Sequence, residues 1–282
     1  MRVRNEYTYT RTYNGPVKAV ILDWSGTAAD AYVIAPAVVF VEVFKKQGVE
    51  ISMTEARGPM GLRKDLHIKA LTEEPAIRDR WKSIKGKLPD QSDVDAMFAD
   101  FVPLQLDCLR QYAGLLPGVA EVTQELRRRG IKLGSSTGFT KDMVAILREE
   151  AEKQGYTLDC SVAGDEVIHG ARPKPHMVYR NMDLLDISPI QSVVKVDDTV
   201  SGVGEALEAG CWGVGVTRYS NYMDISTIEE AEALPAEEIE RRHEMTKEML
   251  RKSGAHYVID STADLLPVID DINERLARGE RP

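Results

Sequence analysis

AVILDWSGTAAD, residues 19–30, is the stretch that decides how this chain folds. It begins with a short apolar run that ends on Asp23 and passes at once into a glycine turn carrying Ser25 and Thr27. A short run rich in branched side chains and closed by a turn is typical of a strand buried on both faces. We therefore expect Asp23 at the carboxyl end of a central strand, the edge where open α/β sheets bind their ligands.

The composition narrows the class of protein. A chain of 282 residues with 43% hydrophobic side chains can bury one large core or two moderate ones. The net charge of -9 argues against binding to nucleic acid or to an anionic membrane, because both need a basic face. The cysteines, Cys108, Cys160 and Cys211, show no metal-binding spacing, which suits a reducing compartment. Since the sequence shows neither an apolar stretch of about 20 residues nor a signal peptide pattern, we expect a cytoplasmic protein.

The pattern on either side of the first strand differs from that of the strand itself. Residues 1–17 form an N-terminal arm in which Tyr and Thr alternate at residues 7–10, so a short edge strand and a loosely ordered terminus are both open. From residue 33 to 112 the sequence reads as a series of helices, with a capping box at Ser52 and Glu55. We expect a helical insert over residues 33–112.

Strand and helix signals alternate from residue 113 to the end. This alternation indicates a parallel sheet with right-handed crossovers and helices on both faces. We therefore expect an α/β fold whose Rossmann-like core comprises residues 1–32 and 113–282 and is interrupted by the helical insert. The later strands are predicted at residues 131–137, 158–164, 192–198, 211–217 and 255–261.

Several residues with chemical potential fall at the ends of predicted strands. Because the carboxyl ends of parallel strands share one edge of the sheet, these residues are expected to converge. Two carboxylates can supply a nucleophile for phosphorus and hold Mg²⁺, a hydroxyl and a glycine amide can bind a nonbridging oxygen, and a guanidinium can neutralise transition-state charge. Each feature alone is weak, but their combination indicates phosphoryl transfer. The residues are Asp23, Thr137, Gly138, Arg172 and Asp198.

The order of these segments resembles the haloacid dehalogenase superfamily over nearly the whole chain after the arm. The resemblance implies a HAD-like core and a helical cap domain that closes over the active site. Most members that cleave phosphate esters have a second aspartate two positions after the nucleophile as general acid, whereas this chain has Ser25. A serine hydroxyl is too weak an acid to protonate an alkoxide efficiently. Ester hydrolysis is disfavoured, although Ser25 as a turn residue in an impaired phosphatase stays open.

Within the superfamily the chain resembles the phosphonatase family, which hydrolyses phosphonoacetaldehyde. ARGPMGLRKDLHIKALTEEP, residues 56–75, is similar to that family's cap segment, and DWSGT, SSTGFT, ARPKP, VDDTVSG and GAHYVID resemble its other motifs. The resemblance implies that Asp23 is the nucleophile and a Mg²⁺ ligand. It also implies that the backbone carbonyl of Ser25 and the carboxylate of Asp198 are the other protein ligands, and that Lys64 forms a Schiff base. An iminium accepts the electron pair of the broken carbon–phosphorus bond, so no acid is needed at residue 25.

The cap segment also places residues around Lys64. A lysine must be unprotonated to attack an aldehyde, so burial or nearby positive charge should lower its pKa. If a helix begins near Pro59, then Met60, Lys64 and His67 share one face. Met60 would then pack against the substrate and His67 would shuttle protons. The spacing alone favours an exposed lysine and a core methionine over functional roles for Lys64 and Met60. The resemblance to the family favours the functional roles instead.

Some residues depart from the family pattern. Gly202 stands where the superfamily often has an acidic residue four positions after Asp198, so metal support from Glu205 or from water stays open. Asp197, where glycine is common, is interpreted as a turn or supporting residue rather than a ligand. Phe139 stands where the family leads us to expect a tyrosine, and Val33 stands where it leads us to expect a cysteine.

Together these residues predict magnesium-dependent hydrolysis of phosphonoacetaldehyde to acetaldehyde and phosphate. The family leads us to expect a homodimer joined through the cap, which agrees with the apolar face of residues 37–44. Two alternatives remain. One is a phosphatase of the same fold acting on a small phosphate ester, and the other is a noncatalytic binding protein, which Gly202 favours.

Overall fold

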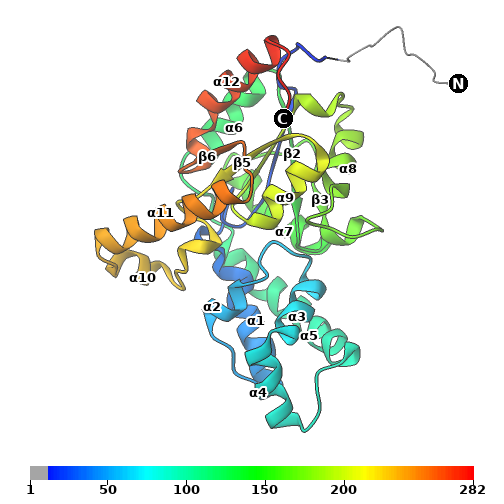
Figure 1. Ribbon diagram of the computed structural model, residues 1–282, viewed down its shortest axis with the longest axis vertical. Coiled ribbons are helices and arrows are strands. Elements are labelled where there is room, and N and C mark those ends of the chain that lie inside the picture. The colour runs from blue at the N-terminus through cyan, green and yellow to red at the C-terminus, as the bar shows by residue number, and fades with distance from the viewer. Residues whose placement is uncertain (1–11) are drawn as a thin grey trace, which may run out of the picture.

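Six parallel strands form one sheet in the computed structural model, which describes residues 12–282. The alternation predicted in the N-terminal arm lies outside these residues. The strand order is β3-β2-β1-β4-β5-β6, and each predicted strand is found, so the parallel α/β fold is confirmed (Figure 1). The strands are β1 (Ala19–Leu22), β2 (Lys132–Thr137), β3 (Val162–Ala163), β4 (Val193–Asp197), β5 (Trp212–Val216) and β6 (Tyr257–Ile259).

The first strand lies at the centre of the sheet because it is apolar on both faces. Ala19 pairs with Lys132 of β2 on one side and with Val193 of β4 on the other. All four residues of β1 are buried, and alternate residues enter two different hydrophobic clusters on opposite faces. Helices that cover these faces are α6 (Val119–Arg128), α7 (Lys141–Lys153), α8 (His176–Leu185), α9 (Val200–Ala209), α11 (Ala236–Lys252) and α12 (Leu265–Ala277).

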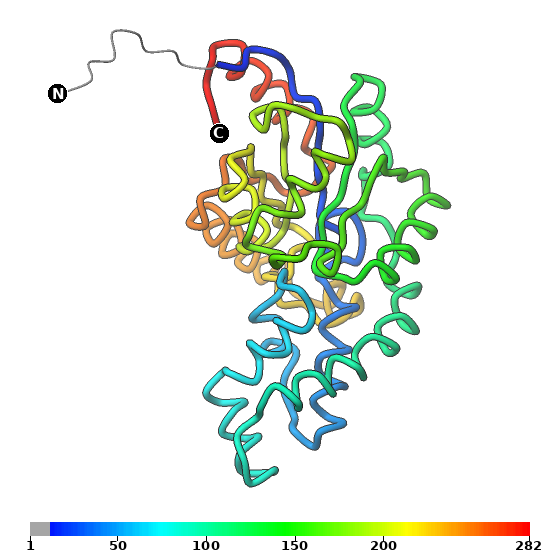
Figure 2. The backbone as a smooth tube through the Cα atoms, turned by 90° about the vertical axis from the view of Figure 1, so that its right-hand side faces the viewer, coloured from blue at the N-terminus to red at the C-terminus, as the bar shows by residue number. Residues whose placement is uncertain are grey.

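Five of the six α-helices between β1 and β2 form a separate group below the sheet in Figures 1 and 2. Aromatic contacts fill its interior: the Phe40 and Phe101 ring centroids are 4.6 Å apart, and those of Phe44 and Trp81 are 6.4 Å apart. The apolar face of residues 37–44 therefore packs largely inside this group. We propose that it is the cap, with bounds at residues 33 and 112. Its helices are α1 (Ile34–Lys46), α2 (Met53–Arg57), α3 (Lys64–Glu73), α4 (Pro75–Lys85) and α5 (Gln91–Leu109).

The helix predicted from Pro59 begins instead at Lys64, and the earlier start was wrong. The preceding turn contains Gly61 at φ +94°, a left-handed conformation that a continuous helix does not allow. A Cβ on Gly61 would lie 2.3 Å from Ser201 Oγ, so the turn needs glycine to pack against the core. Met60 consequently lies in a turn rather than on a helical face shared with Lys64.

Strained backbone marks the passage from β1 into the cap. Asp30, Tyr32 and Val33 have φ values of 52°, 64° and 56°, which is rare for residues other than glycine. Such residues cost of order 1–3 kcal/mol each and persist only where their surroundings hold them. Asp30 Oδ1 accepts hydrogen bonds from the amides of Ile34 at 3.1 Å and Ala35 at 3.3 Å. The aspartate thus fixes the start of α1.

Two further observations complete the fold. The short helix α10 (Ile228–Ala233) was not predicted from the sequence, and it follows the loop after β5. In the part of the chain that the structure describes, no helix has the length and apolar character needed to cross a membrane.

Candidate active site

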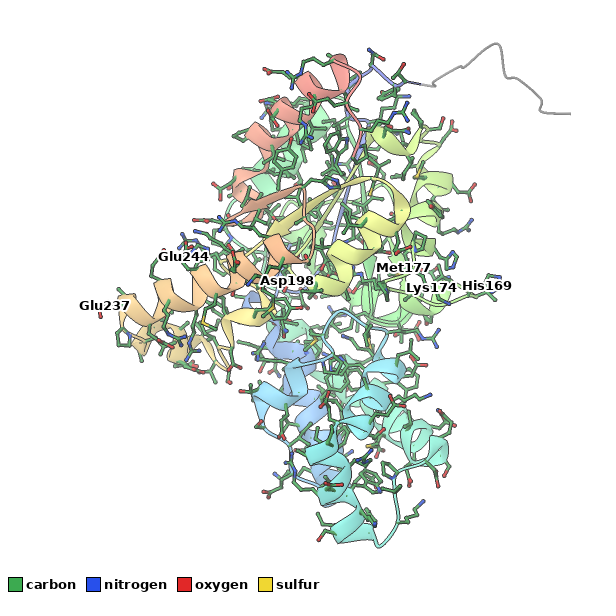
Figure 3. The ribbon with its side chains drawn as sticks, in the orientation of Figure 1. His169, Lys174, Met177, Asp198, Glu237 and Glu244 are labelled. Carbon is green, nitrogen blue, oxygen red and sulfur yellow. The ribbon has the colours of Figure 1, made fainter. Side chains whose placement is uncertain are left out.

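A small pocket lies between the carboxyl edge of the sheet and the cap. Its volume is about 20 Å³, which is room for roughly one water molecule. Asp198 follows β4 near the border between the core and the cap helices in Figure 3. The pocket brings together most of the residues that the sequence singled out, although His67 does not line it. Its lining is Asp23, Ser25, Val33, Pro36, Met60, Gly61, Lys64, Thr137, Gly138, Phe139, Arg172, Asp198 and Thr199.

Asp23 presents one fixed carboxylate oxygen and one free oxygen. Arg172 Nη1 donates to Asp23 Oδ2 at 3.0 Å, and both side chains are buried. Among the described residues, no group makes a hydrogen bond to Asp23 Oδ1, which is also buried. A buried carboxylate oxygen without a partner is costly, so Oδ1 is suited to a ligand or reacting group.

Asp198 is fully buried beside other acidic groups. The amide of Asn221 donates to Asp198 Oδ2 at 2.8 Å, and the Thr27 hydroxyl donates to Oδ1 at 3.4 Å. Burial, together with the negative charges of Asp197 and Asp23, raises the pKa of Asp198 well above its usual range. A cation beside this carboxylate would favour its ionised form.

Asp197 lies close to both of these aspartates. One carboxylate oxygen from each of Asp23, Asp197 and Asp198 lies within 4.8 Å of the other two. However, the carboxylate of Asp197 is already satisfied by Lys195 Nζ at 2.6 Å and Arg172 Nη2 at 3.1 Å. Burial raises the pKa of Asp197, but these two cations outweigh it and the net shift is downward. We therefore interpret Asp197 as a supporting residue.

Gly202 is explained by the position of Asp197. A Cβ on Gly202 would lie 1.9 Å from Asp197 Cγ, so the aspartate fills the space that any side chain at residue 202 would need. Thr199 completes the arrangement, because its hydroxyl donates to Asp197 Oδ1 at 2.7 Å and accepts from the Gly202 amide at 3.1 Å. The departures at residues 197 and 202 are thus one structural feature.

Glu205 belongs to the same buried network. Its Oε2 lies 3.1 Å from Arg172 Nε and accepts a hydrogen bond from Ser136 Oγ at 2.8 Å. Holding Arg172 accounts for the position of this oxygen, whereas Glu205 Oε1 is buried without a hydrogen-bond partner among the described residues and lies outside the acidic cluster of Asp23, Asp197 and Asp198. Lys195 is a functional residue beyond those predicted from the sequence, although a lysine inside the buried strand VVKVD indicates that it neutralises a buried carboxylate.

The charges of this network fit a divalent cation. Four carboxylates are buried here, and they are opposed by the two cations Arg172 and Lys195 when Lys64 is neutral. Burial raises the pKa of Asp198 and of Glu205, so the four carboxylates carry two unbalanced negative charges only where a bound cation keeps them ionised. The free oxygen of Asp23 and the carboxylate of Asp198 are hard ligands of the kind that Mg²⁺ prefers.

Ser25 is the residue in place of the usual general acid. It lines the pocket, and its side chain makes a hydrogen bond with Asp30. Burial raises the pKa of Asp30 to about 6, and this hydrogen bond opposes the rise. The Ser25 side chain thus has a local partner at the cap junction.

Lys64 enters the pocket from the cap in an apolar setting. Its side chain is only 4% exposed, and Nζ lies 4.6 Å from the ring centroid of Phe139 and 5.7 Å from that of Phe40. Burial lowers the pKa of Lys64 to about 8, with Asp23 opposing the shift and Arg172 adding to it. The lysine is therefore close to the protonation state that attack on a carbonyl requires.

His67 lies behind the pocket rather than in its wall. Its ring stacks on Phe40 with centroids 3.8 Å apart, and Nε2 lies 2.8 Å from the carbonyl oxygen of Ala56. Nε2–H therefore donates to that carbonyl, and Nδ1 carries the lone pair. Burial, with the charge of Lys64, holds the pKa of His67 well below its usual range. The imidazole is neutral.

Thr137, Gly138 and Met60 line the pocket on the side where the cap turn meets β2. A Cβ on Gly138 would lie 2.3 Å from the carbonyl oxygen of Leu62, so glycine permits this close approach. Thr137 Oγ1 accepts a hydrogen bond from the Phe139 amide at 3.3 Å. The hydroxyl remains at the pocket wall.

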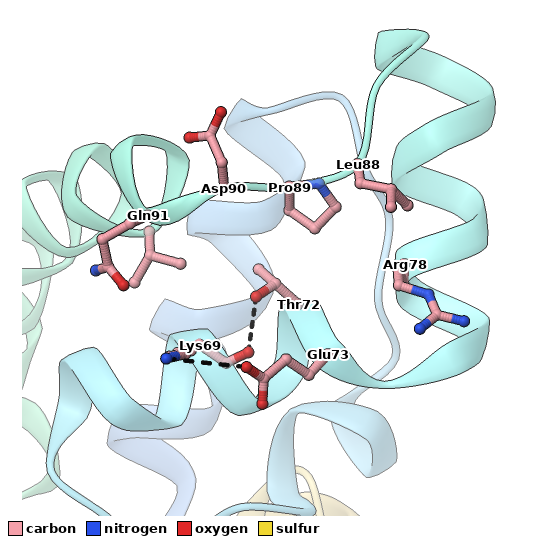
Figure 4. A pocket seen from close by; sticks show the side chains of 9 residues that line it. Lys69, Thr72, Glu73, Arg78, Leu88, Pro89, Asp90 and Gln91 are labelled. Carbon is pink, nitrogen blue, oxygen red and sulfur yellow. Dashed lines mark hydrogen bonds and ion pairs between the residues drawn. The ribbon is translucent and has the colours of Figure 1, made fainter.

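A larger hollow of about 340 Å³ lies within the cap, away from these residues (Figure 4). Some of its polar groups pair with one another: Lys69 Nζ lies 4.0 Å from Glu73 Oε1, and the Thr72 hydroxyl donates to the Lys69 carbonyl at 2.7 Å. None of the candidate catalytic residues lines it. We therefore place the chemistry in the small pocket.

Comparison with known proteins agrees with this geometry. The family model for haloacid dehalogenase-like hydrolases matches residues 17–210. Phosphonoacetaldehyde hydrolase of Nitratidesulfovibrio vulgaris is 43% identical over 97% of this chain and 97% of its own length. The Pseudomonas aeruginosa enzyme of that name is 42% identical over 96% of this chain and 98% of its own. A crystal structure of a phosphonoacetaldehyde hydrolase-like protein from Oleispira antarctica has a TM-score of 0.94 at 38% identity, covering 99% of this chain and 100% of that one.

This chain is therefore a member of the haloacid dehalogenase-like hydrolases and, within them, belongs to the family of the phosphonoacetaldehyde hydrolases. More distant structures show the fold alone. One is a β-phosphoglucomutase from Clostridium difficile, with a TM-score of 0.65 at 18% identity over 92% of this chain and 98% of that one.

Proposed function

We propose that this enzyme hydrolyses the carbon–phosphorus bond of phosphonoacetaldehyde to give acetaldehyde and phosphate. The observation that carries the proposal is that Lys64 and Asp23 line one pocket, an amine with a lowered pKa from the cap and a carboxylate from the core. The relatives with this substrate in their names match nearly the whole chain, which supports the same reaction.

The reaction begins at Lys64. Its neutral amine adds to the aldehyde carbon, one proton is taken up from water and a water molecule leaves, so that a protonated imine links Lys64 to the substrate. Asp23 then attacks phosphorus, and the electron pair of the carbon–phosphorus bond moves into the iminium to form an enamine. The leaving group is a carbon atom of the enamine rather than an oxygen, so no proton from the Ser25 side chain is needed.

The products leave in two hydrolytic steps. The enamine takes up a proton on carbon, and water releases acetaldehyde from Lys64. A second water attacks the phosphorus of the aspartyl phosphate and frees phosphate and the Asp23 carboxylate. Arg172 holds Asp23 and faces the charge on the transferring group, and we assign substrate contacts to Met60, Thr137 and Gly138. His67 lies behind the pocket, and we propose that it serves substrate binding indirectly, through its proximity to Lys64.

We further propose Mg²⁺ as the cofactor, held by Asp23, Asp198 and the backbone carbonyl of Ser25. Its chemistry would be to offset the repulsion between the carboxylates and an anionic phosphonate. The uncompensated negative charge and the partnerless Asp23 Oδ1 support this ligand set. Chelation with EDTA should abolish phosphate release, and added Mg²⁺ should restore it.

Borohydride trapping tests the Schiff base directly. Enzyme, phosphonoacetaldehyde and borohydride are mixed, and peptides are mapped for a reduced adduct. We expect the adduct on Lys64. Its absence there would rule out the proposed mechanism, and release of phosphate from esters that survives Lys64→Ala would favour the phosphatase alternative.

The proposal extends to assembly and location. We propose a homodimer joined through the cap, where Val38 and Val41 of α1 are only partly buried. Light scattering of the purified protein at a mass twice that of the chain would support it. The three cysteines are unpaired, which supports a reducing, cytoplasmic location.

A further inference from the structure

A buried arginine ties the cap to the core. Arg57 is the last residue of α2, yet it is only 3% exposed because its side chain enters the core loops. Its guanidinium donates to the backbone carbonyls of Tyr32 and Ile225. Nη1 lies 3.3 Å from Asn221 Oδ1, and Nε lies 3.8 Å from an Asp224 oxygen. A planar fork of donors is suited to hold several acceptors at once.

Asn221 connects this arginine to the candidate metal site. Its side-chain Nδ2 donates to the Arg57 carbonyl at 3.1 Å, so the two residues bind each other reciprocally. Its backbone amide donates to Asp198 Oδ2 at 2.8 Å. The neighbouring Ser220 hydroxyl donates to the Asp198 carbonyl at 2.9 Å. A single residue therefore contacts Arg57 with its side chain and Asp198 with its backbone.

The same arginine reaches the strained junction between core and cap. The Tyr32 carbonyl that it binds belongs to a residue at φ +64°. The Tyr32 amide donates to the Tyr219 carbonyl at 2.8 Å, in the loop that also carries Asn221. Movement of the cap away from the core would break the Arg57 contacts to the junction and to Asn221 together.

We propose that Arg57 and Asn221 form a latch that couples closure of the cap to the position of Asp198. Arg57 is thus a positioning residue for the metal site, although it does not touch the pocket. The inference rests on the proposed Mg²⁺ site, and its test does not depend on which substrate is turned over.

Titration with Mg²⁺ alone, followed by calorimetry without substrate, tests the latch. In Arg57→Lys and in Asn221→Ala we expect affinity for Mg²⁺ to fall about tenfold, the size typical for residues that support metal ligands. The double variant should lose no more than the larger single loss, because both changes break one connection. Limited proteolysis should cut faster near residues 30–33 in Arg57→Lys.

Arg80→Ala is the matched control. Arg80 of α4 binds the Glu50 carbonyl and Glu55, so it also supports α2, but from within the cap. It should keep the parent Mg²⁺ affinity and the parent circular dichroism spectrum.

A folded Arg57→Lys protein with unchanged Mg²⁺ affinity and unchanged cleavage would overturn the latch, as would a parent protein that binds no Mg²⁺. A parent that binds Mg²⁺ but does not hydrolyse phosphonoacetaldehyde would contradict the proposed function and leave the latch standing.

Discussion

The two walls of the pocket are built differently. The core wall presents charged groups at strand ends: Asp23 and Asp197 are held by ion pairs with Arg172, and Asp198 by hydrogen bonds. The cap wall presents one lysine, whose amine lies between the ring of Phe40 from the cap and the ring of Phe139 from the core. Fixed charges suit a group that must attack phosphorus and hold a cation, whereas an apolar setting suits an amine that must lose its proton. Each wall therefore prepares a different reactant.

The largest effect should come from the core wall. Asp23→Asn should lower phosphate release by on the order of 10⁴-fold or more, because an amide cannot form the aspartyl phosphate. Imine formation belongs to the cap wall, so borohydride should still attach the aldehyde to Lys64 in this variant. Mass mapping checks both at once. If Asp23→Asn lost both phosphate release and the reduced adduct on Lys64, the two walls would not act separately.

A smaller loss is expected from crowding the core network. Gly202→Ala places a methyl group against the Asp197 carboxylate, which should cost about 1–3 kcal/mol of unfolding free energy. Activity should fall roughly tenfold to a hundredfold, because Asp197 helps to hold Arg172. Gly204→Ala is the milder comparison on the same helix, since its Cβ would lie 3.3 Å from Pro173 Cβ, a close contact that a small shift relieves, against 1.9 Å from Asp197 Cγ at Gly202. Thermal melts and initial rates measure how the two variants differ in stability and activity. Equal effects of both would contradict the close packing of Asp197 against Gly202.

The setting of Lys64 in the cap wall should determine how the rate of borohydride trapping depends on pH. Because burial lowers the pKa of Lys64 to about 8, the neutral amine is lost as pH falls below that value. The rate of borohydride trapping should drop roughly fivefold between pH 8 and pH 7, which follows from the neutral fraction. In Asp23→Asn the midpoint should move to lower pH, because the Asp23 charge raises the pKa of Lys64. A midpoint near 10.5, the ordinary value of a lysine, would contradict the apolar setting.

The smallest effect should come from a lysine on the same helix that faces away from the pocket. Lys69 pairs with Glu73 at 4.0 Å, and its side chain is 49% exposed beside the hollow in Figure 4. An exposed pair of this kind contributes about 0–1 kcal/mol. Lys69→Ala should therefore change kcat/KM less than about twofold. A large loss in steady-state assays would mean that the lysines of α3 act together.

Much of the core wall could be predicted from the sequence. The run AVILD marks a buried strand by its apolar, branched residues, and the same pattern recurs before Asp198. Parallel strands end at one edge, so the convergence of Asp23 and Asp198 follows from topology alone. A lysine inside the buried strand VVKVD indicates by itself that a carboxylate lies beside it, but only the structure shows that this carboxylate is Asp197.

The cap wall was harder to predict because it depends on contact between distant segments. Gly61 interrupts the helix expected from Pro59, and the reason is the proximity of Ser201, which no local pattern records. The role of Gly202 was likewise hidden until Asp197 was found to occupy the neighbouring space. Arg57 carries no local signal at all, since its partners lie in the junction and in the loop after β5.

The uncompensated negative charge of the core wall also bears on how firmly the protein stays folded. A cation that binds only the folded chain stabilises it by RT ln(1 + [L]/Kd), about 2.7 kcal/mol at a hundredfold excess over Kd. The melting temperature should consequently rise with Mg²⁺ concentration, and sodium chloride of equal ionic strength should not reproduce the rise. The charges that prepare this pocket for a phosphonate thus make the metal a participant in folding, even in the absence of substrate.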